Sequence, residues 1–369
     1  MAVEFEHRRI SLEGYRKICM ETFLQLGMTE QCASEVTENL LFADLRGTNS
    51  HGIARMKQYT SQVAKGFINC KAEPEIVSER GGAVVIDGHN GMGAHIASFA
   101  MKKTVEKAKN GGMAFTTVRN STHFGVAAFY STMALKEDQM GLSFTNSLPF
   151  VAHYGSMKPC IGTNPLSIAF PCKEHRDFVL DMATSVVARG NIINCAREGK
   201  DIPYGWACDK DGHPTTNAQA ALDGYCLPLG ADRNYKGSGI ALSVDILCGI
   251  LSGGCAGLDV RPIFTLAEDE LSKGPGIGHA FGAVNIGYFM DPEEFKARMD
   301  HYIDQLLSAP LAPDFKEIMM PGEPEFRLYD ENLALGSVKI ALENLNEVKA
   351  ICAKFCPGLN PEDYIVDGP

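Results

Sequence analysis

The pattern of apolar and polar positions predicts that the first seventy or so residues are helical. Ser11 and Thr29 are good N-caps, and each precedes an amphipathic segment, the second of which runs to about Arg46. Ser50 stands before apolar residues spaced three to four apart, which predicts a third helix that ends near Gly66. Near Pro74 this helical pattern stops, and we expect a linker or domain boundary there.

Strand and helix patterns alternate in the middle of the chain. Short apolar runs at residues 81–88 and 114–118 read as buried strands, with a periodic helix at 94–109 between them. A helix-like run at 126–135 and a strand pattern that ends at 179–185 follow. Residues 240–256 form the longest apolar run, but Asp245 interrupts it, which favours a packed interior helix over a membrane span.

The last part of the chain becomes helical again. Asp291 followed by Pro292 is a favourable helix start, and residues 330–354 carry a helical apolar rhythm. The whole pattern predicts an α/β protein with helical segments at both ends.

Composition limits the function. With 369 residues, 45% of them hydrophobic, the chain is long enough for two domains, and its net charge of -11 without a basic cluster argues against nucleic acid and anionic membranes. Its twelve cysteines are scattered with no C-x-x-C pair, which predicts buried thiols in a reducing compartment. The acidic N-terminus shows no signal peptide pattern, and small-molecule chemistry is the favoured class of function.

His51, Arg55 and Tyr59 are spaced four apart on the predicted third helix, so their side chains fall on one face. A proton carrier, a fixed cation and a phenol near a helix N-terminus suit the binding of a small carboxylate and the transfer of a proton beside it. The helix dipole should make the His51 proton more acidic. The competing interpretation is a capping His followed by Arg and Tyr stems that cover a neighbouring element.

Further polar residues follow the predicted strands. The glycine-rich turn at 88–95 has the form of a dinucleotide-binding turn, but Arg119 and Asn120 stand where that fold requires an acidic residue for the ribose. Arg119 is instead compatible with a 2′-phosphate. His123 follows the second strand, and Asp181 follows another, where α/β sheets usually bind ligands; each also has a purely structural interpretation as part of a capped turn.

Six ordered motifs together resemble a known family. They are Asn49-Ser50-His51-Gly52 with Arg55, Ser121-Thr122-His123-Phe124-Gly125, Gly162-Thr163-Asn164-Pro165, Asp181-Met182-Ala183-Thr184-Ser185, Asn234-Tyr235-Lys236-Gly237 and Pro321-Gly322-Glu323. In this order they are similar to the malate/L-lactate/sulfolactate dehydrogenase family, which includes ureidoglycolate dehydrogenase, 2,3-diketogulonate reductase and cyclic-ketimine reductases. The resemblance covers nearly the whole chain.

The resemblance implies an α/β, non-Rossmann NAD(P)-binding fold in which a mixed-sheet cofactor domain joins a helical domain built from both termini. The expected parts are residues 1–75 (N-terminal helices of the substrate and dimer domain), 76–290 (NAD(P)-binding domain) and 291–369 (C-terminal helices packing on the N-terminal part). It also implies a cytoplasmic homodimer that uses NAD or NADP, with NAD slightly preferred. Hydride transfer with a carboxylate anchor and a proton donor requires no metal, and no His, Asp and Glu cluster in the sequence has convincing ligand spacing.

The family motifs assign roles to individual residues. The implied catalytic residues are His51, with Ser50 beside it, and His123, and which of the two histidines is the principal acid or base stays open. Arg55, Tyr59 and Ser147 are the expected substrate contacts. The expected cofactor contacts are His123, Phe124, Gly125, Asp181, Met182, Ala183, Tyr235, Lys236, Gly322 and Glu323.

The leading hypothesis is therefore an NAD(P)-dependent oxidoreductase that transfers a hydride to or from a small 2-hydroxy or 2-keto carboxylate of the malate, lactate, sulfolactate or ureidoglycolate type. One alternative is reduction of a cyclic imino acid such as piperideine-2-carboxylate. Another, of a different class, is a catalytically silent nucleotide-binding protein.

Overall fold

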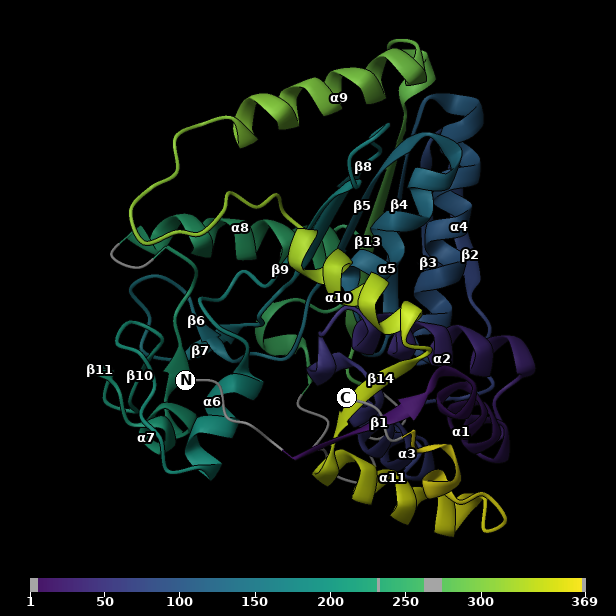
Figure 1. Ribbon diagram of the computed structural model, residues 1–369, viewed down its shortest axis with the longest axis vertical. Helices are drawn as coiled ribbons and strands as arrows, with labels where there is room; N and C mark the ends of the chain where they lie inside the picture. Colours follow the sequence, from purple (N-terminus) through teal and green to yellow (C-terminus); the bar gives the residue numbers. More distant parts are fainter. Residues whose placement is uncertain (1–5, 231–232, 262–273, 367–369) are drawn as a thin grey trace.

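A computed structural model describes residues 6–230, 233–261 and 274–366. The helices are α1 Leu12–Gln25, α2 Glu30–Leu45, α3 Met56–Ala64, α4 Gly93–Gly111, α5 Ala127–Ser131, α6 Arg189–Arg197, α7 Ala218–Asp223, α8 Tyr235–Asp245, α9 Pro292–Leu307, α10 Glu323–Ala334 and α11 Leu342–Phe355 (Figure 1). The strands are β1 His7–Ser11, β2 Glu75–Arg80, β3 Ala83–Asp87, β4 Met113–Ser121, β5 Gln139–Thr145, β6 Val151–Ala152, β7 Pro159–Ile161, β8 Leu166–Phe170, β9 Phe178–Met182, β10 Ala207–Cys208, β11 Pro214–Thr215, β12 Tyr225–Cys226, β13 Ile277–Asn285 and β14 Ser337–Ala341.

The largest sheet has seven strands in the order β2-β3-β4-β13-β5-β8-β9. β3 and β4 run parallel, whereas β13 pairs antiparallel with both β4 and β5, and β8 pairs antiparallel with β5 and β9. The α/β class and the mixed sheet expected from the sequence are therefore confirmed. A smaller sheet has the order β11-β10-β12-β6-β7.

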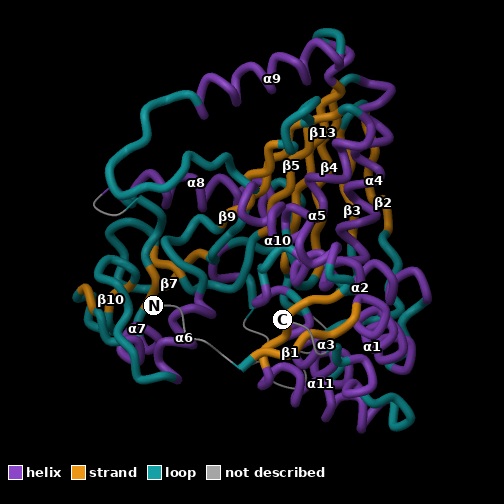
Figure 2. Tube along the Cα trace, viewed as in Figure 1, coloured by secondary structure: helices purple, strands orange, loops and turns teal. Residues whose placement is uncertain are grey.

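Helices cover both faces of the large sheet, as the colours of Figure 2 make visible. Phe281 on β13 packs in the core formed with α4 and α5, while its neighbour Ala280 packs with Val244 and Cys248 of the α8 segment on the other face. Successive side chains of a strand point to opposite faces, so a central strand with helices on both sides is apolar throughout.

The two ends of the chain fold together. β1 pairs antiparallel with β14, and one core contains residues of α1, α2 and α3 together with Val338, Leu345 and Val348. Neither strand was expected, because both lie inside segments whose sequence reads as helical. Their pairing joins residues more than 300 positions apart, and no local pattern reports such a partner. β2, at residues 75–80, was likewise not predicted.

The helical N-terminal segments begin where the sequence indicates. The Ser11 and Thr29 hydroxyls accept hydrogen bonds from the N–H groups of Gly14 and Cys32, and the Asp291 carboxylate caps α9. The predicted start of the third helix was wrong. Residues 49–51 and 53–55 form two 3-10 turns, η1 (Asn49–His51) and η2 (Ile53–Arg55), and the α-helix begins only at Met56.

The apolar run at 240–256 is helical as far as Ile250, but only one face of this helix is packed. α8 continues into a π-helical turn, η5 (Ile246–Ile250), whose Cys248 is buried. Ile246 and Ile250 on the opposite face are 50% and 64% exposed. The expectation of a packed interior helix therefore holds for one face only, because the sequence shows the apolar residues but not how many neighbours cover them.

The C-terminal part contacts two regions of the molecule. Asp300 on α9 accepts backbone hydrogen bonds from residues 173–175, between β8 and β9, whereas Asn332 on α10 donates to the carbonyl of Leu45 at the end of α2. The domain boundaries at 75 and 290 stay predictions.

Candidate active site

The segment that carries Ser50, His51 and Arg55 is held by its own polar groups. Ser50 Oγ lies 2.9 Å from His51 Nδ1, and Arg55 Nε donates to the Ser50 carbonyl at 2.7 Å. Arg55 Nη1 donates to Gln58 Oε1 at 2.6 Å. Two of the three guanidinium nitrogens are therefore bound within this segment, which fixes the plane of the Arg55 side chain.

Tyr59 and His123 meet this segment. The rings of His51 and His123 are stacked with their centroids 5.4 Å apart, and the Tyr59 hydroxyl lies 2.8 Å from His123 Nδ1. His123 Nδ1 also accepts the Gly125 N–H at 3.3 Å, so this nitrogen is an acceptor and the Tyr59 hydroxyl is the donor. The neutral His123 ring then carries its proton on Nε2. The structure thus brings together five predicted residues from η1, η2, α3 and the turn after β4: Ser50, His51, Arg55, Tyr59 and His123.

Both histidines are neutral at pH 7. Burial, together with the Arg55 cation, lowers the pKa of His51 to about 3. The pKa of His123 is lowered well below its usual range, first by burial and then by Arg55 and His51. The sequence predicted a more acidic His51 but from a helix dipole, and no α-helix begins at this residue. The cause is instead loss of water and a neighbouring positive charge.

A buried histidine that the sequence analysis missed supports His123. His279 on β13 is fully buried, its Nε2 lies 2.8 Å from Ser121 Oγ, and its Nδ1 lies 2.8 Å from Thr145 Oγ1. Phe124 stacks on this ring with centroids 4.7 Å apart. The Phe124 side chain is thus part of the core, where it anchors the turn that presents His123. The signal in the sequence that could have indicated it is His279 itself, a polar residue within the apolar strand pattern at 277–285.

Gly125 is required by close packing in this turn. Its φ of +84° is in the left-handed region, and a Cβ at this position would lie 1.7 Å from Asn39 Oδ1 of α2. Only glycine fits such a backbone position without a shift. Helix α2 therefore fixes the turn after His123 from the opposite side.

The remaining predicted residues gather around the end of β9. Asp181 Oδ2 accepts the Ala128 N–H at the start of α5, 2.9 Å away, five residues after His123. Thr184 donates its backbone N–H to the Thr163 carbonyl, and the Thr163 N–H donates to Ser147 Oγ at 3.0 Å. Ser147 and the segment 181–184 are thus neighbours.

Two further predicted motifs, Asn234-Tyr235-Lys236-Gly237 and Pro321-Gly322-Glu323, lie next to β9 and the residues that follow it. Leu229 donates its N–H to the Thr184 carbonyl, and a Cβ on Gly237 would lie 2.0 Å from the Leu229 carbonyl oxygen, so the start of α8 with Tyr235 and Lys236 is adjacent. On the other side Val179 donates its N–H to the Pro321 carbonyl.

Gly322 completes this second contact. It has a φ of +88°, and a Cβ there would lie 2.7 Å from the Val179 carbonyl oxygen. Glu323, the next residue, accepts the Met320 N–H at 3.1 Å and pairs with Arg327. Segments far apart in sequence therefore surround β9, with Gly322 beside Val179 near the start of the strand.

The start of α8 has the chemistry of a phosphate site. Asn234, its N-terminal flanking residue, makes no side-chain capping bond, and the N–H groups of a first helical turn point toward a ligand at the helix N-terminus. Lys236 lies in that turn and is exposed. These groups fit the pyrophosphate of a dinucleotide.

The glycine-rich turn at 88–95 has a different role. A Cβ on Gly93 would lie 2.3 Å from the Thr122 carbonyl oxygen, and the Gly93 N–H donates to Thr122 Oγ1. The N-terminus of α4 thus packs on the segment leading to His123, where a phosphate would otherwise stand. Arg119 Nε pairs with Asp87 Oδ2 at 2.9 Å.

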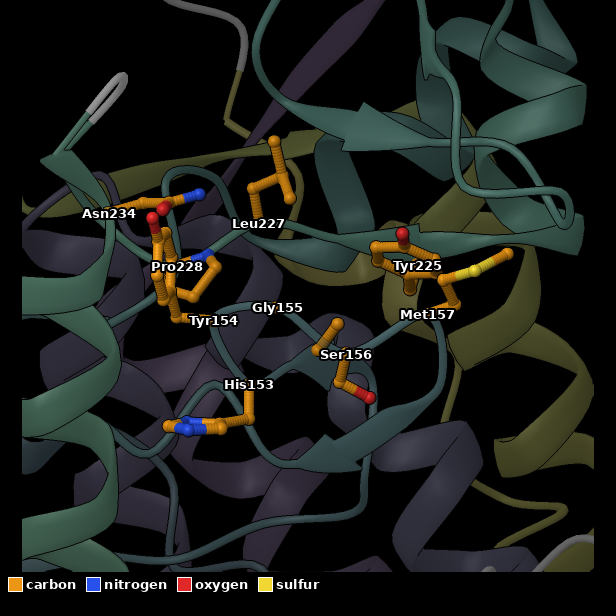
Figure 3. A pocket seen from close by; sticks show the side chains of 10 residues that line it. His153, Tyr154, Gly155, Ser156, Met157, Tyr225, Leu227, Pro228 and Asn234 are labelled. Atoms are coloured by element: carbon orange, nitrogen blue, oxygen red, sulfur yellow. The ribbon is translucent and has the colours of Figure 1, made fainter.

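A shallow cavity of about 260 Å³ lies beside the start of α8 (Figure 3). Its walls are mainly neutral and include Tyr154, Tyr225, Pro228 and Asn234. Tyr154 contacts Tyr235 edge to face at 5.9 Å.

None of the helices that the structure describes is both long and apolar enough to cross a membrane.

The chain is similar to proteins of known activity over nearly its whole length. The model of the malate/L-lactate dehydrogenase family matches residues 10–349. The malate dehydrogenase of Pyrococcus horikoshii is 36% identical over 94% of this chain and 96% of its own length. The solved structure of sulfolactate dehydrogenase from Methanocaldococcus jannaschii is 37% identical and superposes with a TM-score of 0.87, covering 96% of this chain and 99% of that one.

A relative with a different named activity is also similar. The Delta(1)-pyrroline-2-carboxylate/Delta(1)-piperideine-2-carboxylate reductase of Pseudomonas putida is 31% identical over 86% of this chain and 90% of its own length.

Proposed function

The chain belongs to the malate/L-lactate dehydrogenase family of oxidoreductases, and on that premise we propose that it interconverts a small 2-hydroxy carboxylate and its 2-keto acid with a nicotinamide cofactor. The observation that carries this proposal is the meeting of His51, His123 and Tyr59 beside the Arg55 cation. Two neutral imidazoles next to a fixed guanidinium suit a reaction that moves a proton beside a bound carboxylate.

Arg55 is the proposed carboxylate anchor. Its guanidinium plane is fixed by Ser50 and Gln58, and a guanidinium fork matches the two oxygens of a carboxylate. Hydrogen bonds between charged groups contribute about 1.5–3 kcal/mol each.

The two histidines are suited to complementary roles. With its Nδ1 proton donated to Ser50 Oγ, neutral His51 presents the lone pair of Nε2 and takes the proton of the substrate hydroxyl. His123 presents an Nε2–H, because Tyr59 and Gly125 donate to its Nδ1, and this N–H stabilises negative charge on the same oxygen. In reduction the proton returns from His51 to the oxygen. The bound nicotinamide supplies or accepts the hydride at C2 of the substrate.

The residues around the end of β9 are the proposed cofactor contacts. The first turn of α8 with Lys236 would hold the pyrophosphate, and the Asp181 carboxylate is placed to accept from a ribose hydroxyl. Met182, Ala183, Tyr235, Gly322 and Glu323 lie in the same group of segments. Thr163, which links Ser147 to Thr184, brings the proposed substrate contact Ser147 next to them.

Kinetics of two variants test the proposal. His51→Ala should lower kcat about 10²–10⁴-fold, the usual contribution of a positioned imidazole, with NADH affinity unchanged. Arg55→Ala should mainly raise KM for the substrate, by about tenfold to a hundredfold. The exposed His213→Ala is the matched control. Wild-type kinetics in His51→Ala would overturn the assignment.

Reduction of a cyclic imino acid is the second candidate. The similarity to the Pseudomonas putida reductase favours it, and the same Arg55 would bind the carboxylate while the acid protonates the ring nitrogen. Rates with a panel of 2-keto acids and cyclic ketimines, each with NADH and with NADPH, decide between the two substrates. A chain that binds NADH but turns over no member of the panel would contradict both.

We propose NAD as the preferred cofactor. Arg119, the cation considered for a 2′-phosphate, is paired with Asp87, which leaves it less suited to that role. Dissociation constants for NADH and NADPH, measured by the change in nicotinamide fluorescence, test the preference, and tighter binding of NADPH would reverse it.

A homodimer in the cytoplasm is the proposed state. Ile246, Ile250 and Leu251 are at least half exposed on one helical segment, and burying them against a second copy would remove apolar surface from water. All twelve cysteines are free thiols, as a reducing compartment allows. Sedimentation of the wild type and of Ile250→Asp tests the dimer, and a monomeric wild type would contradict it.

A further inference from the structure

A buried carboxylate lies directly beneath the segment that carries His51 and Arg55. Asp44, near the end of α2, is only 4% exposed. Its Oδ2 accepts two hydrogen bonds of 2.7 Å, one from the Tyr15 hydroxyl on α1 and one from the backbone N–H of Ile53. Ile53 stands two residues after His51 and two before Arg55. The carboxylate therefore connects the two packed helices to the centre of the segment.

Gly52 shows how closely the segment rests on Asp44. A Cβ at Gly52 would lie 2.1 Å from the carboxyl carbon and from both oxygens of Asp44. This distance is far below van der Waals contact, so the backbone approaches the carboxylate as only glycine allows. The motif Ser50-His51-Gly52 thus needs its glycine because of a side chain eight positions earlier.

The other hydrogen bonds of the segment close within the segment itself or onto its immediate neighbours. The N–H groups of His51, Gly52 and Arg55 donate to the carbonyls of Thr48, Asn49 and Gly52. These bonds shape the two 3-10 turns, and neither turn has a side-chain cap. They do not reach α1 or α2, whereas the Asp44 to Ile53 bond does, beside the packing of the Ile53 side chain in the core that it shares with both helices.

We propose that Asp44 is a positioning residue of the active site: by binding the Ile53 N–H and packing on Gly52, its carboxylate sets where His51 and Arg55 stand relative to His123. Asp44 itself acts only through the backbone of residues 52–53. This inference rests on the proposed function, since its kinetic consequence is read through the reaction of His51 and Arg55. A positioning error of about 1 Å can cost a hundredfold in rate.

The experiment compares Asp44→Asn and Asp44→Ala with Asp300→Asn. Asp300 is the matched control, because its carboxylate is also buried and also binds backbone N–H groups, but on α9. Asp44→Ala should lower kcat/KM about a hundredfold. Asn keeps an oxygen that accepts from Ile53, so Asp44→Asn should recover at least a tenfold part of that loss. Asp300→Asn should leave kcat/KM within twofold.

Two readouts separate positioning from general destabilisation. NADH affinity should be unchanged in both Asp44 variants, and hydrogen exchange of the Ile53 amide should become faster while that of the α4 amides does not. A second variant, Gly52→Ala, should lower kcat/KM in the wild type but add little in Asp44→Ala, since its clash with the carboxylate is then gone.

Each outcome decides the inference. Equal kcat/KM for Asp44→Ala and the wild type, or parallel losses of NADH affinity and activity, would overturn it. Fully additive effects of Gly52→Ala and Asp44→Ala would overturn it as well. A wild type without turnover on any substrate would refute the proposed function instead, and the exchange of the Ile53 amide would still report on the position of the segment.

Discussion

At the scale of single residues, the site depends on which atom of each imidazole bears the proton. Gly125 can only donate through its N–H, and this makes His123 Nδ1 an acceptor and Tyr59 a donor. The Tyr59 hydroxyl thus selects the tautomer of the His123 imidazole. It does not take over the role of that imidazole in the reaction. Tyr59 was expected to be a substrate contact, whereas in the structure its hydroxyl donates to His123 Nδ1.

Tyr59→Phe tests this selection. The variant removes one hydrogen bond between neutral groups, which contributes about 0.5–1.5 kcal/mol, so kcat/KM should fall about two- to tenfold. Steady-state kinetics measure it. Tyr288→Phe is the control, because that hydroxyl donates to the Asn110 carbonyl at 2.8 Å and is unrelated to His123. A Tyr59→Phe enzyme as active as the control would show that the tautomer does not need the phenol.

At the scale of elements, the strand β13 connects the two strands whose ends form the site. His279 binds Ser121 at the end of β4 and Thr145 at the end of β5, so one ring aligns three strands. Complete burial lowers the pKa of His279 to about 3. The ring is therefore neutral in the folded protein, whereas an unfolded chain binds a proton near pH 6.5.

This difference predicts loss of stability in acid. Because the unfolded state binds more protons, stability falls as the pH drops below about 6.5 toward the folded pKa. Between pH 6.5 and 5 this group should remove about 1–2 kcal/mol from the free energy of unfolding. Denaturant unfolding across that range measures the slope, and His279→Gln should make it shallower than in the exposed control His213→Gln. An unchanged slope would contradict the assignment.

At the scale of the whole molecule, His95 joins the N-terminal helices to the helix that covers the large sheet. From α4 its ring binds Glu35 of α2 at 2.6 Å and Glu73 at 3.2 Å, and the side chain is 2% exposed. Burial lowers the pKa of His95, but the hydrogen bonds to the two carboxylates outweigh it, so the pKa is raised. An imidazole whose pKa is raised by two carboxylates thus links the two parts of the chain.

The sign of this contribution is opposite to that of His279. A raised folded pKa stabilises the protein below the unfolded value near 6.5, and the contribution is lost as the pH rises through the folded pKa. His95→Gln should therefore lower the free energy of unfolding by about 1–3 kcal/mol more at pH 6 than at pH 9. Thermal unfolding at the two pH values checks it. An equal loss at both would mean that the imidazole is not charged.

The sequence by itself determined what short-range physics controls. The caps at Ser11, Thr29 and Asp291 start their helices as predicted, since a side-chain oxygen and an N–H two or three residues later need no distant partner. The ordered motifs identified the family, because six short segments in one order are a property of the chain and not of its folding. His51 and Arg55 were named for the same reason.

Only the tertiary structure decided which of these segments touch. β1 pairs with β14 across almost the whole chain, the His123 ring contacts Tyr59 across 64 positions, and the Asp44 carboxylate binds the Ile53 N–H where a continuous helix was expected. Each contact depends on the burial of groups that are far apart in sequence, and local propensity is too weak to report it. The neutral histidines follow from the same cause, since loss of water around a ring is a property of the packed molecule and cannot be read from the residues beside it.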